Sequence, residues 1–184
     1  MPSLLRIVGY AIVSADGMIA DGLGRIPPAL IHDADQRYFF QGMDAADVLV
    51  HGRNSYEDRP GALDRKRIVV TRQVSAVAPH ADNPNAVLWN PTGAKIEEAC
   101  KTLGITHGVA AAVGGPDVYG LFLPRYDTFH LSKAAHARIP GGRPVFPGIP
   151  PATPEDLLDR HGLRPGPPSR LDADAGVSVT VWTR

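Results

Sequence analysis

The sequence predicts an α/β fold with a mostly parallel central sheet, helices on both faces and an antiparallel hairpin at the C-terminal edge. Short apolar runs typical of buried strands recur along the chain, at residues 4–13, 46–50, 68–70 and 108–113. Amphipathic segments lie between them, and the clearest spans residues 92–104. The last alternating run, residues 177–182, follows the turn-forming residues 172–176, which is typical of a closing hairpin.

Size and composition are those of an ordinary globular protein, and we expect residues 1–184 to form a single domain. Lys plus Arg and Asp plus Glu both number 19, so the charge gives no reason to expect nucleic acid or a membrane as partner. Cys100 is the only cysteine, which excludes an internal disulfide and fits the reducing cytoplasm. No apolar run approaches a membrane span, and we expect no signal peptide at residues 1–6.

The first predicted strand, residues 4–13, leads through a turn and a loop into a helix. Asp16-Gly17 is a turn signal, and we interpret Asp16 as a turn former rather than a catalytic acid. Residues 21–28 are polar and punctuated by glycine and proline, which indicates a loop. Asp33 and Asp35 then offer caps for a helix, whose apolar face is formed by Phe39, Phe40 and Met43.

The middle of the chain alternates short strands with polar connections. The strand at residues 68–70 follows the basic run 65–67, for which a solvated turn and a functional group are equally good interpretations. A further short strand is predicted at residues 87–89. The helix at residues 92–104 places Cys100 on its apolar face, as a small hydrophobe rather than a nucleophile, and Gly104 ends it.

Residues 113–123 hold the best candidate for an anion site. They follow the buried strand 108–113, and Gly114-Gly115 allow the backbone to turn sharply. Pro116 suits the first position of a helix, whose apolar face holds Val118, Leu121 and Phe122. A helix that begins directly after a strand presents free N–H groups and a positive dipole end to an anion such as a pyrophosphate. A plain tight turn between strand and helix explains the same residues.

The C-terminal part of the chain is predicted to be richer in loops. Residues 126–132 alternate as a strand does, and residues 138–151 are a proline-rich loop. Residues 153–156 form a capping box for a short helix, and the proline-broken residues 163–171 suit an edge strand. The seven histidines show no metal-ligand spacing, so we expect no metal site and place His130 and His136 on a surface or strand face.

Four boxes, spread colinearly over residues 7–147, resemble dihydrofolate reductases and the C-terminal reductase domain of bacterial riboflavin-biosynthesis deaminase/reductases. They are Val113-Gly114-Gly115-x-x-Val118-Tyr119, Ser14-x-Asp16-Gly17-x-Ile19-Ala20, His51-Gly52-Arg53-Asn54-Ser55-Tyr56-Glu57 and the strand that ends at Leu131-Ser132. The resemblance implies a dihydrofolate reductase-like three-layer fold. The second box, and the absence of a tryptophan from residues 21–28, favour the riboflavin type. No zinc-binding deaminase residues are present, so the resemblance is to a stand-alone reductase.

The resemblance implies NADPH as the cofactor, bound along the glycine segment and the neighbouring turns. Glycines would let the pyrophosphate approach the backbone, while hydroxyl and guanidinium groups would hold phosphate. In the family the end of the strand at residues 68–70 holds the 2′-phosphate, so Arg72 favours NADPH over NADH. The residues implied at this site are Ile19, Ala20, Gly52, Arg53, Asn54, Ser55, Thr71, Arg72, Val113, Gly114, Gly115, Pro116, Asp117 and Val118.

The resemblance also implies a pocket acid near the start of the helix, beside a small-molecule substrate. Asp35 matches best, and as the catalytic residue it would orient the substrate or relay a proton. Asp33 is the rival, and with Asp35 as the acid it would be the N-cap. In folate reductases Arg65 would stand where the glutamate tail binds. The residues implied at the substrate are Ile12, Asp33, Asp35, Phe39, Arg65 and Ser132.

Together these features predict an NADPH-dependent reductase that transfers hydride to a small nitrogen heterocycle or imine-type substrate. The resemblance points to a 5-amino-6-(5-phosphoribosylamino)uracil reductase of riboflavin biosynthesis. A dihydrofolate reductase is one alternative, and a non-catalytic nucleotide-binding protein on the same fold is the other. The family further implies a cytoplasmic protein and allows a homodimer.

Overall fold

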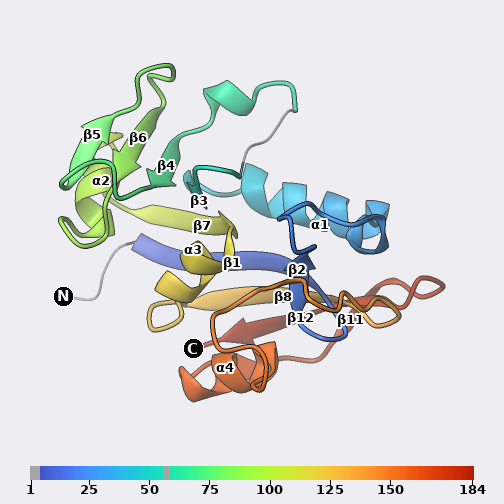
Figure 1. Cartoon of the computed structure of the whole chain (residues 1–184). Helices are drawn as coiled ribbons and strands as arrows, with labels where there is room; N and C mark the ends of the chain where they lie inside the picture. Colours follow the sequence, from blue (N-terminus) through green and yellow to red (C-terminus); the bar gives the residue numbers. More distant parts are fainter. Residues whose placement is uncertain (1–4, 56–58) are drawn as a thin grey trace.

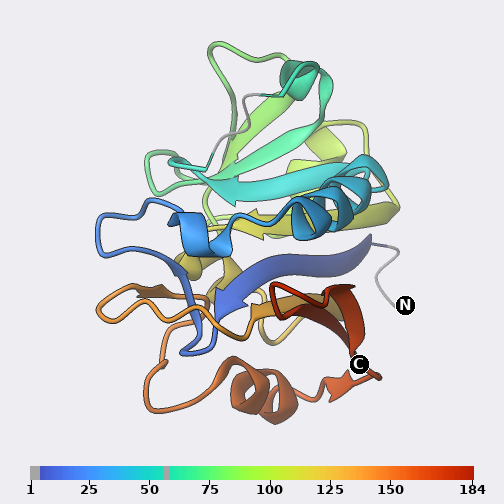
Figure 2. The same ribbon diagram turned by 90° about the vertical axis from the view of Figure 1, so that its right-hand side faces the viewer.

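A computed structural model of the protein describes residues 5–55 and 59–184, and a ten-stranded mixed sheet runs through it (Figures 1 and 2). Its inner strands are parallel and lie in the order β8, β1, β7, β3, β4, β6. Leu4, the predicted start of the first strand, lies outside the described residues. The inner strands are β1 (Leu5–Ser14), β3 (Val48–Gly52), β4 (Arg67–Val70), β6 (Ala86–Trp89), β7 (Gly108–Gly114) and β8 (Thr128–Ala134).

Antiparallel strands close both edges of the sheet. The predicted hairpin is present, because β11 (Ser169–Asp172) pairs with β12 (Val177–Thr183), which in turn pairs with β8. The predicted edge strand at residues 163–171 is broken into β10 (Arg164–Pro165) and β11, since prolines within it lack the N–H that a ladder needs. Three short strands were not predicted, namely β5 (Val77–Pro79) beside β6, and the separate pair β2 (Met18–Ala20) and β9 (Arg143–Pro144).

The helices of the described chain are short except for the first. The predicted capping box is confirmed, since the Thr153 hydroxyl accepts from the Asp156 N–H at 3.1 Å and the Asp156 carboxylate accepts from the Thr153 N–H at 2.9 Å. The second helix begins at Ile96 rather than residue 92, because a turn closed by the Asn90 carbonyl occupies the residues before it. The helices are α1 (Asp33–Asp44), α2 (Ile96–Thr102), α3 (Pro116–Leu121) and α4 (Pro154–Arg160), with 3-10 turns η1 (Pro28–Leu30) and η2 (Ala62–Asp64).

The two faces of the sheet are covered unequally. On one face, alternate residues of β1 such as Ile7 and Val13 join a large apolar core with α2, α3 and α4. On the other face α1 covers a small cluster of buried residues, Met43, Leu49 and Ala111. Strand alternation sends Tyr10 of β1, and its neighbours His130 and Ser132 of β8, to this second face, so α1 packs on a more polar surface. The layers are therefore α1, the sheet, and α2 with α3 and α4.

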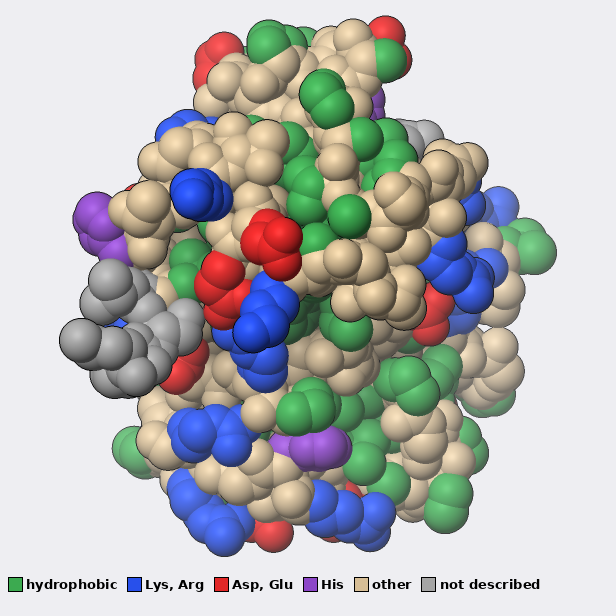
Figure 3. Space-filling view, turned by 90° about the vertical axis from the view of Figure 1, so that its left-hand side faces the viewer, with side chains coloured by type: hydrophobic (Ala, Val, Ile, Leu, Met, Phe, Trp, Pro, Cys, Tyr) green, Lys and Arg blue, Asp and Glu red, His purple; other side chains and the backbone are tan. Residues whose placement is uncertain are grey.

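Cys100 lies in the large core at 1 % exposure, which confirms its predicted packing role. Burial raises the pKa of its thiol to about 12, so the thiolate that would act as a nucleophile is not formed near neutral pH. On the molecular face drawn in Figure 3, basic and acidic side chains lie interspersed with apolar ones, in keeping with the equal charge counts. No helix in residues 5–55 and 59–184 has the length and apolar character needed to cross a membrane.

Candidate active site

Three neighbouring parallel strands end in turns that meet at the carboxyl edge of the sheet. Register pairs join His51 on β3 to Gly114 on β7, and Gly52 on β3 to Val70 on β4. The residues after these strands are the glycine segment, the Gly-Arg box and Thr71-Arg72. Because ligands of open α/β sheets bind outside the carboxyl ends of the strands, this edge is the candidate cofactor site.

The glycine segment and the Gly-Arg box are in contact. A Cβ atom on Gly114 would lie 2.8 Å from Oγ of Ser55, so any larger residue there would displace Ser55. Gly115 is the N-cap of α3 with φ 86° and ψ 137°, a backbone conformation that side-chain-bearing residues rarely adopt, and Pro116 follows as the first helical residue. Tyr56 and Glu57, the last two residues of the box, lie outside the described residues.

Polar groups suited to phosphate surround these turns. Arg53 and Arg72 are exposed, whereas Thr71 is 5 % exposed. The Thr71 hydroxyl accepts a hydrogen bond from the Gln73 N–H at 3.2 Å, and its own hydrogen can still be donated to another acceptor. The other residues implied at the cofactor lie on the same turns, with Asn54 and Asp117 exposed, Gly52 and Val113 half-buried, and Val118 buried.

The loop after β1 is held by Asp16. Its carboxylate accepts from the Ser14 hydroxyl at 2.5 Å and from the Ile139 N–H at 3.1 Å. These contacts give Asp16 a structural role in the turn, as predicted. The turn leads into β2, where Ile19 is half-buried and Ala20 is buried beside β9.

Asp35 faces the sheet from the first turn of α1 and is 6 % exposed. Its carboxyl faces the Ser132 hydroxyl on β8, which favours the charged form, and Ser132 is the register partner of Ile12 on β1. Burial raises the pKa of Asp35, while the Ser132 hydrogen bond and the charge of His32 act in the opposite direction. Ile12, Asp35 and Ser132 therefore lie together, and the half-buried Phe39 follows one turn later on α1.

Asp33 does not share this environment. It is exposed and is the first residue of α1, and the N-cap is His32, whose backbone is extended at φ −131° and ψ 125°. The expectation that Asp33 caps the helix is therefore wrong by one residue. Of the two candidate acids, Asp35 is the one that faces Ser132.

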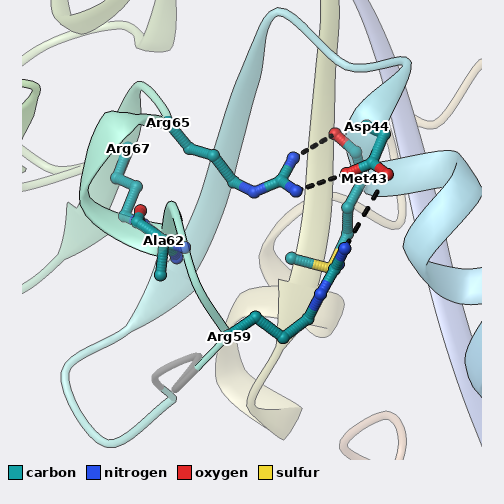
Figure 4. Close-up of polar contacts among 6 residues, drawn as sticks. All are labelled: Met43, Asp44, Arg59, Ala62, Arg65 and Arg67. Atoms are coloured by element: carbon teal, nitrogen blue, oxygen red, sulfur yellow. Dashed lines mark hydrogen bonds and ion pairs between the residues drawn. The ribbon is translucent and has the colours of Figure 1, made fainter.

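Arg65 belongs to a separate cluster at the end of α1 (Figure 4). Its guanidinium donates to the Asp44 carboxylate and, at 3.3 Å, to the Met43 carbonyl oxygen. Arg59 shares the same carboxylate, with 3.8 Å between Nη2 and Oδ2, and its guanidinium lies 3.9 Å from the centre of the Phe40 ring. These contacts attach the segment before β4 to the C-terminal end of the helix, where cations also meet the helix dipole favourably.

Most of α1 separates this cluster from the candidate acid. Asp44 follows Asp35 by nine residues, or about 14 Å along the helix axis at 1.5 Å per residue. Arg65 precedes β4 and so lies at the amino ends of the strands, beside a hollow of about 360 Å³ lined by Asp47, Leu49, Lys66 and Ile105. The structure therefore does not bring Arg65 together with Asp35 and Ser132.

Two hydrogen bonds near the candidate acid were not predicted from the sequence. The Tyr119 hydroxyl on α3 donates to the Tyr10 carbonyl oxygen at 2.6 Å. The Tyr38 hydroxyl lies 2.6 Å from Nδ1 of His130, and the His130 ring stacks on the Tyr10 ring with centroids 4.3 Å apart. Tyr38 follows Asp35 by three residues, so helical spacing could have placed it on the same face of α1, although it could not have identified His130 as its partner.

Solved structures share this arrangement of strands and helices, although no family model and no curated protein matches the sequence. A riboflavin biosynthesis protein from Shewanella sp. PV-4 is 18% identical over 97% of this chain and 98% of its own, with a TM-score of 0.65. Dihydrofolate reductase from Enterococcus faecalis, complexed with NADP(H) and RAB-propyl, is 18% identical over 97% and 96%, with a TM-score of 0.64.

This chain has a dihydrofolate reductase-like fold. A third similar structure is the diaminohydroxyphosphoribosylaminopyrimidine deaminase/5-amino-6-(5-phosphoribosylamino)uracil reductase from Thermotoga maritima, 13% identical with a TM-score of 0.68. The match covers 97% of this chain and 56% of that bifunctional protein. The dihydrofolate reductase-like architecture confirms the fold predicted from the four sequence boxes.

Proposed function

We propose that this dihydrofolate reductase-like protein is an NADPH-dependent reductase of a small nitrogen heterocycle or imine-type substrate. The observation that carries the proposal is the placement of two sets of groups at one edge of the sheet. The three turns after β3, β4 and β7 suit a dinucleotide, and Asp35, which faces Ser132, lies towards the same ends of the strands. Within this class we favour 5-amino-6-(5-phosphoribosylamino)uracil as substrate, because the riboflavin-type loop Ser14-x-Asp16-Gly17 is present.

The turns of the chain fit the phosphates of NADPH. A Cβ on Gly115 would meet no protein atom within 4 Å, so open space lies beside this backbone. A Cβ on the neighbouring Gly114 would instead clash with the Ser55 side chain. Exposed Arg53 and Arg72 would supply charge-assisted hydrogen bonds, with Arg72 at the 2′-phosphate. Bound NADPH would supply the hydride, and the protein would position the nicotinamide ring against the substrate.

The substrate side depends on Asp35. Because burial raises its pKa, the carboxyl can hold a proton closer to neutral pH than an exposed aspartate does. It would then orient the nitrogen of the substrate's C=N group and give it a proton as the carbon of that group accepts hydride. The Ser132 hydroxyl fixes the direction of the carboxyl, and the covering helix α1 keeps bulk water away from it.

A folate reductase is the weaker alternative. The resemblance assigns Arg65 to a glutamate tail, but Arg65 donates to the chain's own Asp44 carboxylate. The loop at residues 21–28 also lacks the tryptophan that folate reductases carry there.

An assay that separates cofactor from substrate tests the proposal. NADPH oxidation is expected with 5-amino-6-(5-phosphoribosylamino)uracil and not with dihydrofolate. NADPH should bind at least about tenfold more tightly than NADH in calorimetry, since a charge-assisted contact contributes about 1.5–3 kcal/mol. Arg72→Ala should remove most of this preference. Equal affinities for both cofactors would contradict the assignment, and binding without any turnover would favour the non-catalytic alternative.

A further inference from the structure

Two side-chain contacts join α1 to β8, one helical turn apart. The first is Asp35 with Ser132, and the second is Tyr38 with His130, at 2.6 Å between the hydroxyl oxygen and Nδ1. Residues i and i+3 share a face of a helix, and residues i and i+2 share a face of a strand. The two contacts therefore lie on the same side of both elements. We call the Asp35–Ser132 contact the first rung and the Tyr38–His130 contact the second rung.

The second rung is itself held in place by β1. Tyr10 is the register partner of His130, and the two rings stack at 4.3 Å with 10° between their planes. The far end of the Tyr10 ring contacts the backbone of α1, since a Cβ on Gly42 would lie only 2.4 Å from its Cζ. Tyr119 on α3 holds the Tyr10 carbonyl at 2.6 Å. His130 therefore has a fixed ring plane against which the Tyr38 hydroxyl can dock.

We propose that the Tyr38–His130 hydrogen bond is a positioning device for Asp35, which fixes the rotation of α1 so that the carboxyl stays buried against Ser132. The C-terminal end of α1 is held by its contacts with Arg65 and Arg59, whereas near its N-terminal end two contacts a turn apart resist rotation about the helix axis more than one does. The inference rests on the proposed function only in giving Asp35 a chemical role. Tyr38 and His130 are positioning residues and act through Asp35.

The other groups near these rungs do not compete for the contact. Desolvation lowers the pKa of His130 to about 4, so the ring is uncharged near neutral pH. Tyr10 and Asp35 both act on the pKa of Tyr38, after its own burial, and raise it further. On β12 the register partner of His130 is the apolar Val181. β11, which also packs on α1, carries Arg170 and Asp172, and neither contributes to the pKa shift of Asp35 or His130.

The test is the titration of the Asp35 carboxyl by carbon NMR in the protein without added ligand. Tyr38→Phe removes the hydroxyl and keeps the ring. We expect α1 to loosen, and the Asp35 midpoint to fall by about 0.5 pH or more, because relief of burial outweighs loss of the Ser132 contact. His130→Phe, which keeps a ring to stack on Tyr10, should give the same shift, and the double variant should give no more than either single one.

Tyr10→Phe is the matched control, since it removes a hydroxyl from the stacked ring and leaves the rung intact. Its Asp35 midpoint should equal that of the wild type. An unchanged midpoint in both Tyr38→Phe and His130→Phe, or additive shifts in the double variant, would overturn the inference, whatever happens to the melting temperature. Because the titration needs no substrate, its failure is distinguishable from failure of the proposed reductase activity.

Discussion

Asp33 and Asp35 are two residues apart in the sequence, yet the helix gives them opposite surroundings. Asp33 is exposed at the first position of α1. Asp35 lies two residues further along the helix, on another side of it, where it faces Ser132 and is 6 % exposed. Sequence reasoning could not choose between them with certainty, because either residue can begin a helix. The choice is made by the extended backbone of His32, which fixes where the helix starts.

Asp35→Asn should lower turnover far more than it lowers NADPH affinity. The amide keeps the shape of the carboxyl but can neither hold nor release the proton, and general acid–base catalysis contributes about 10²–10⁴-fold. Stability should not fall. A raised pKa means that Asp35 loses stabilisation as pH rises through its folded pKa, and the amide avoids that loss. Steady-state kinetics, calorimetry and thermal unfolding measure the three quantities.

Asp33→Asn is the control for this prediction, since asparagine and aspartate are equally good near a helix start. It should retain wild-type turnover. An inactive Asp33→Asn together with an active Asp35→Asn would make Asp33 the pocket acid. Full activity in both variants would show that neither carboxylate is catalytic, and that the proton comes from water.

His130 should make stability dependent on pH in the mildly acidic range. Its folded pKa of about 4 lies below the ordinary value of 6.5, so the unfolded chain binds the extra proton. The stabilisation is complete above pH 6.5 and is lost as pH falls towards 4. Allowing for the partial exposure of the ring, we expect a loss of about 1–2 kcal/mol. Urea unfolding across this range should show it, and His130→Phe should show it less than the exposed control His107→Gln.

At the scale of elements, strong local patterns were sufficient for most of the sheet. The apolar run before Gly114, the capping box at Thr153 and the turn at residues 172–176 each specify a local structure, and each prediction is confirmed. The short strands β2, β5 and β9 have two or three residues and exist only because a partner strand is present. Pairing partners distant in sequence leave no periodic signal, so such strands cannot be predicted locally.

Contacts between elements explain what the sequence could not show of the site. The boxes at Gly52-Arg53 and Gly114-Gly115 were recognisable from the sequence, but the contact of Gly114 with Ser55 depends on β3 lying beside β7. From the sequence pattern alone, His130 is predicted only to lie on one face of its strand. Its partner Tyr38 is 92 residues away, so the pair emerges when α1 is placed on the sheet.

The turn between β7 and α3 should not tolerate a side chain at Gly115. Gly115→Ala places a Cβ on a backbone with φ 86°, at a cost of about 1–3 kcal/mol, and points it into the space proposed for NADPH. We therefore expect both a lower melting temperature and at least about tenfold weaker NADPH binding. The substitution should therefore affect folding as well as binding, because the positive φ is a property of the backbone turn.

Gly104→Ala is the matched control for that variant. Gly104 also has a positive φ, 73°, and a Cβ there would also meet no atom within 4 Å, but it lies at the end of α2. It should lose stability and keep wild-type NADPH affinity. If Gly115→Ala binds NADPH as well as Gly104→Ala does, the glycine turn is structural and not part of a cofactor site.

At the scale of the whole molecule, both halves of the candidate site lie on one mixed sheet but are carried by different layers. The glycine segment continues into α3, on the side of the large core, whereas Asp35 comes from α1 on the other side. The groups proposed to hold substrate and cofactor thus approach the carboxyl edge from opposite faces. Tyr119 joins the α3 layer to the sheet, since its hydroxyl donates to the Tyr10 carbonyl oxygen on β1.

The unequal cores on the two faces mean that the molecule should open in two stages. α1 rests on few buried apolar side chains, whereas β1 and β7 are anchored by the large core. In native-state hydrogen exchange, amides of α1 should exchange through a local opening, whereas amides of β7 should exchange only on global unfolding. The free energy of opening should therefore be lower for α1 than for β7. Equal opening energies for the two would contradict this. Such an opening would carry Asp35 away from Ser132 while the glycine turn stays folded. If the protein is the reductase proposed above, local unfolding of α1 would then let the substrate exchange while the nucleotide stays bound.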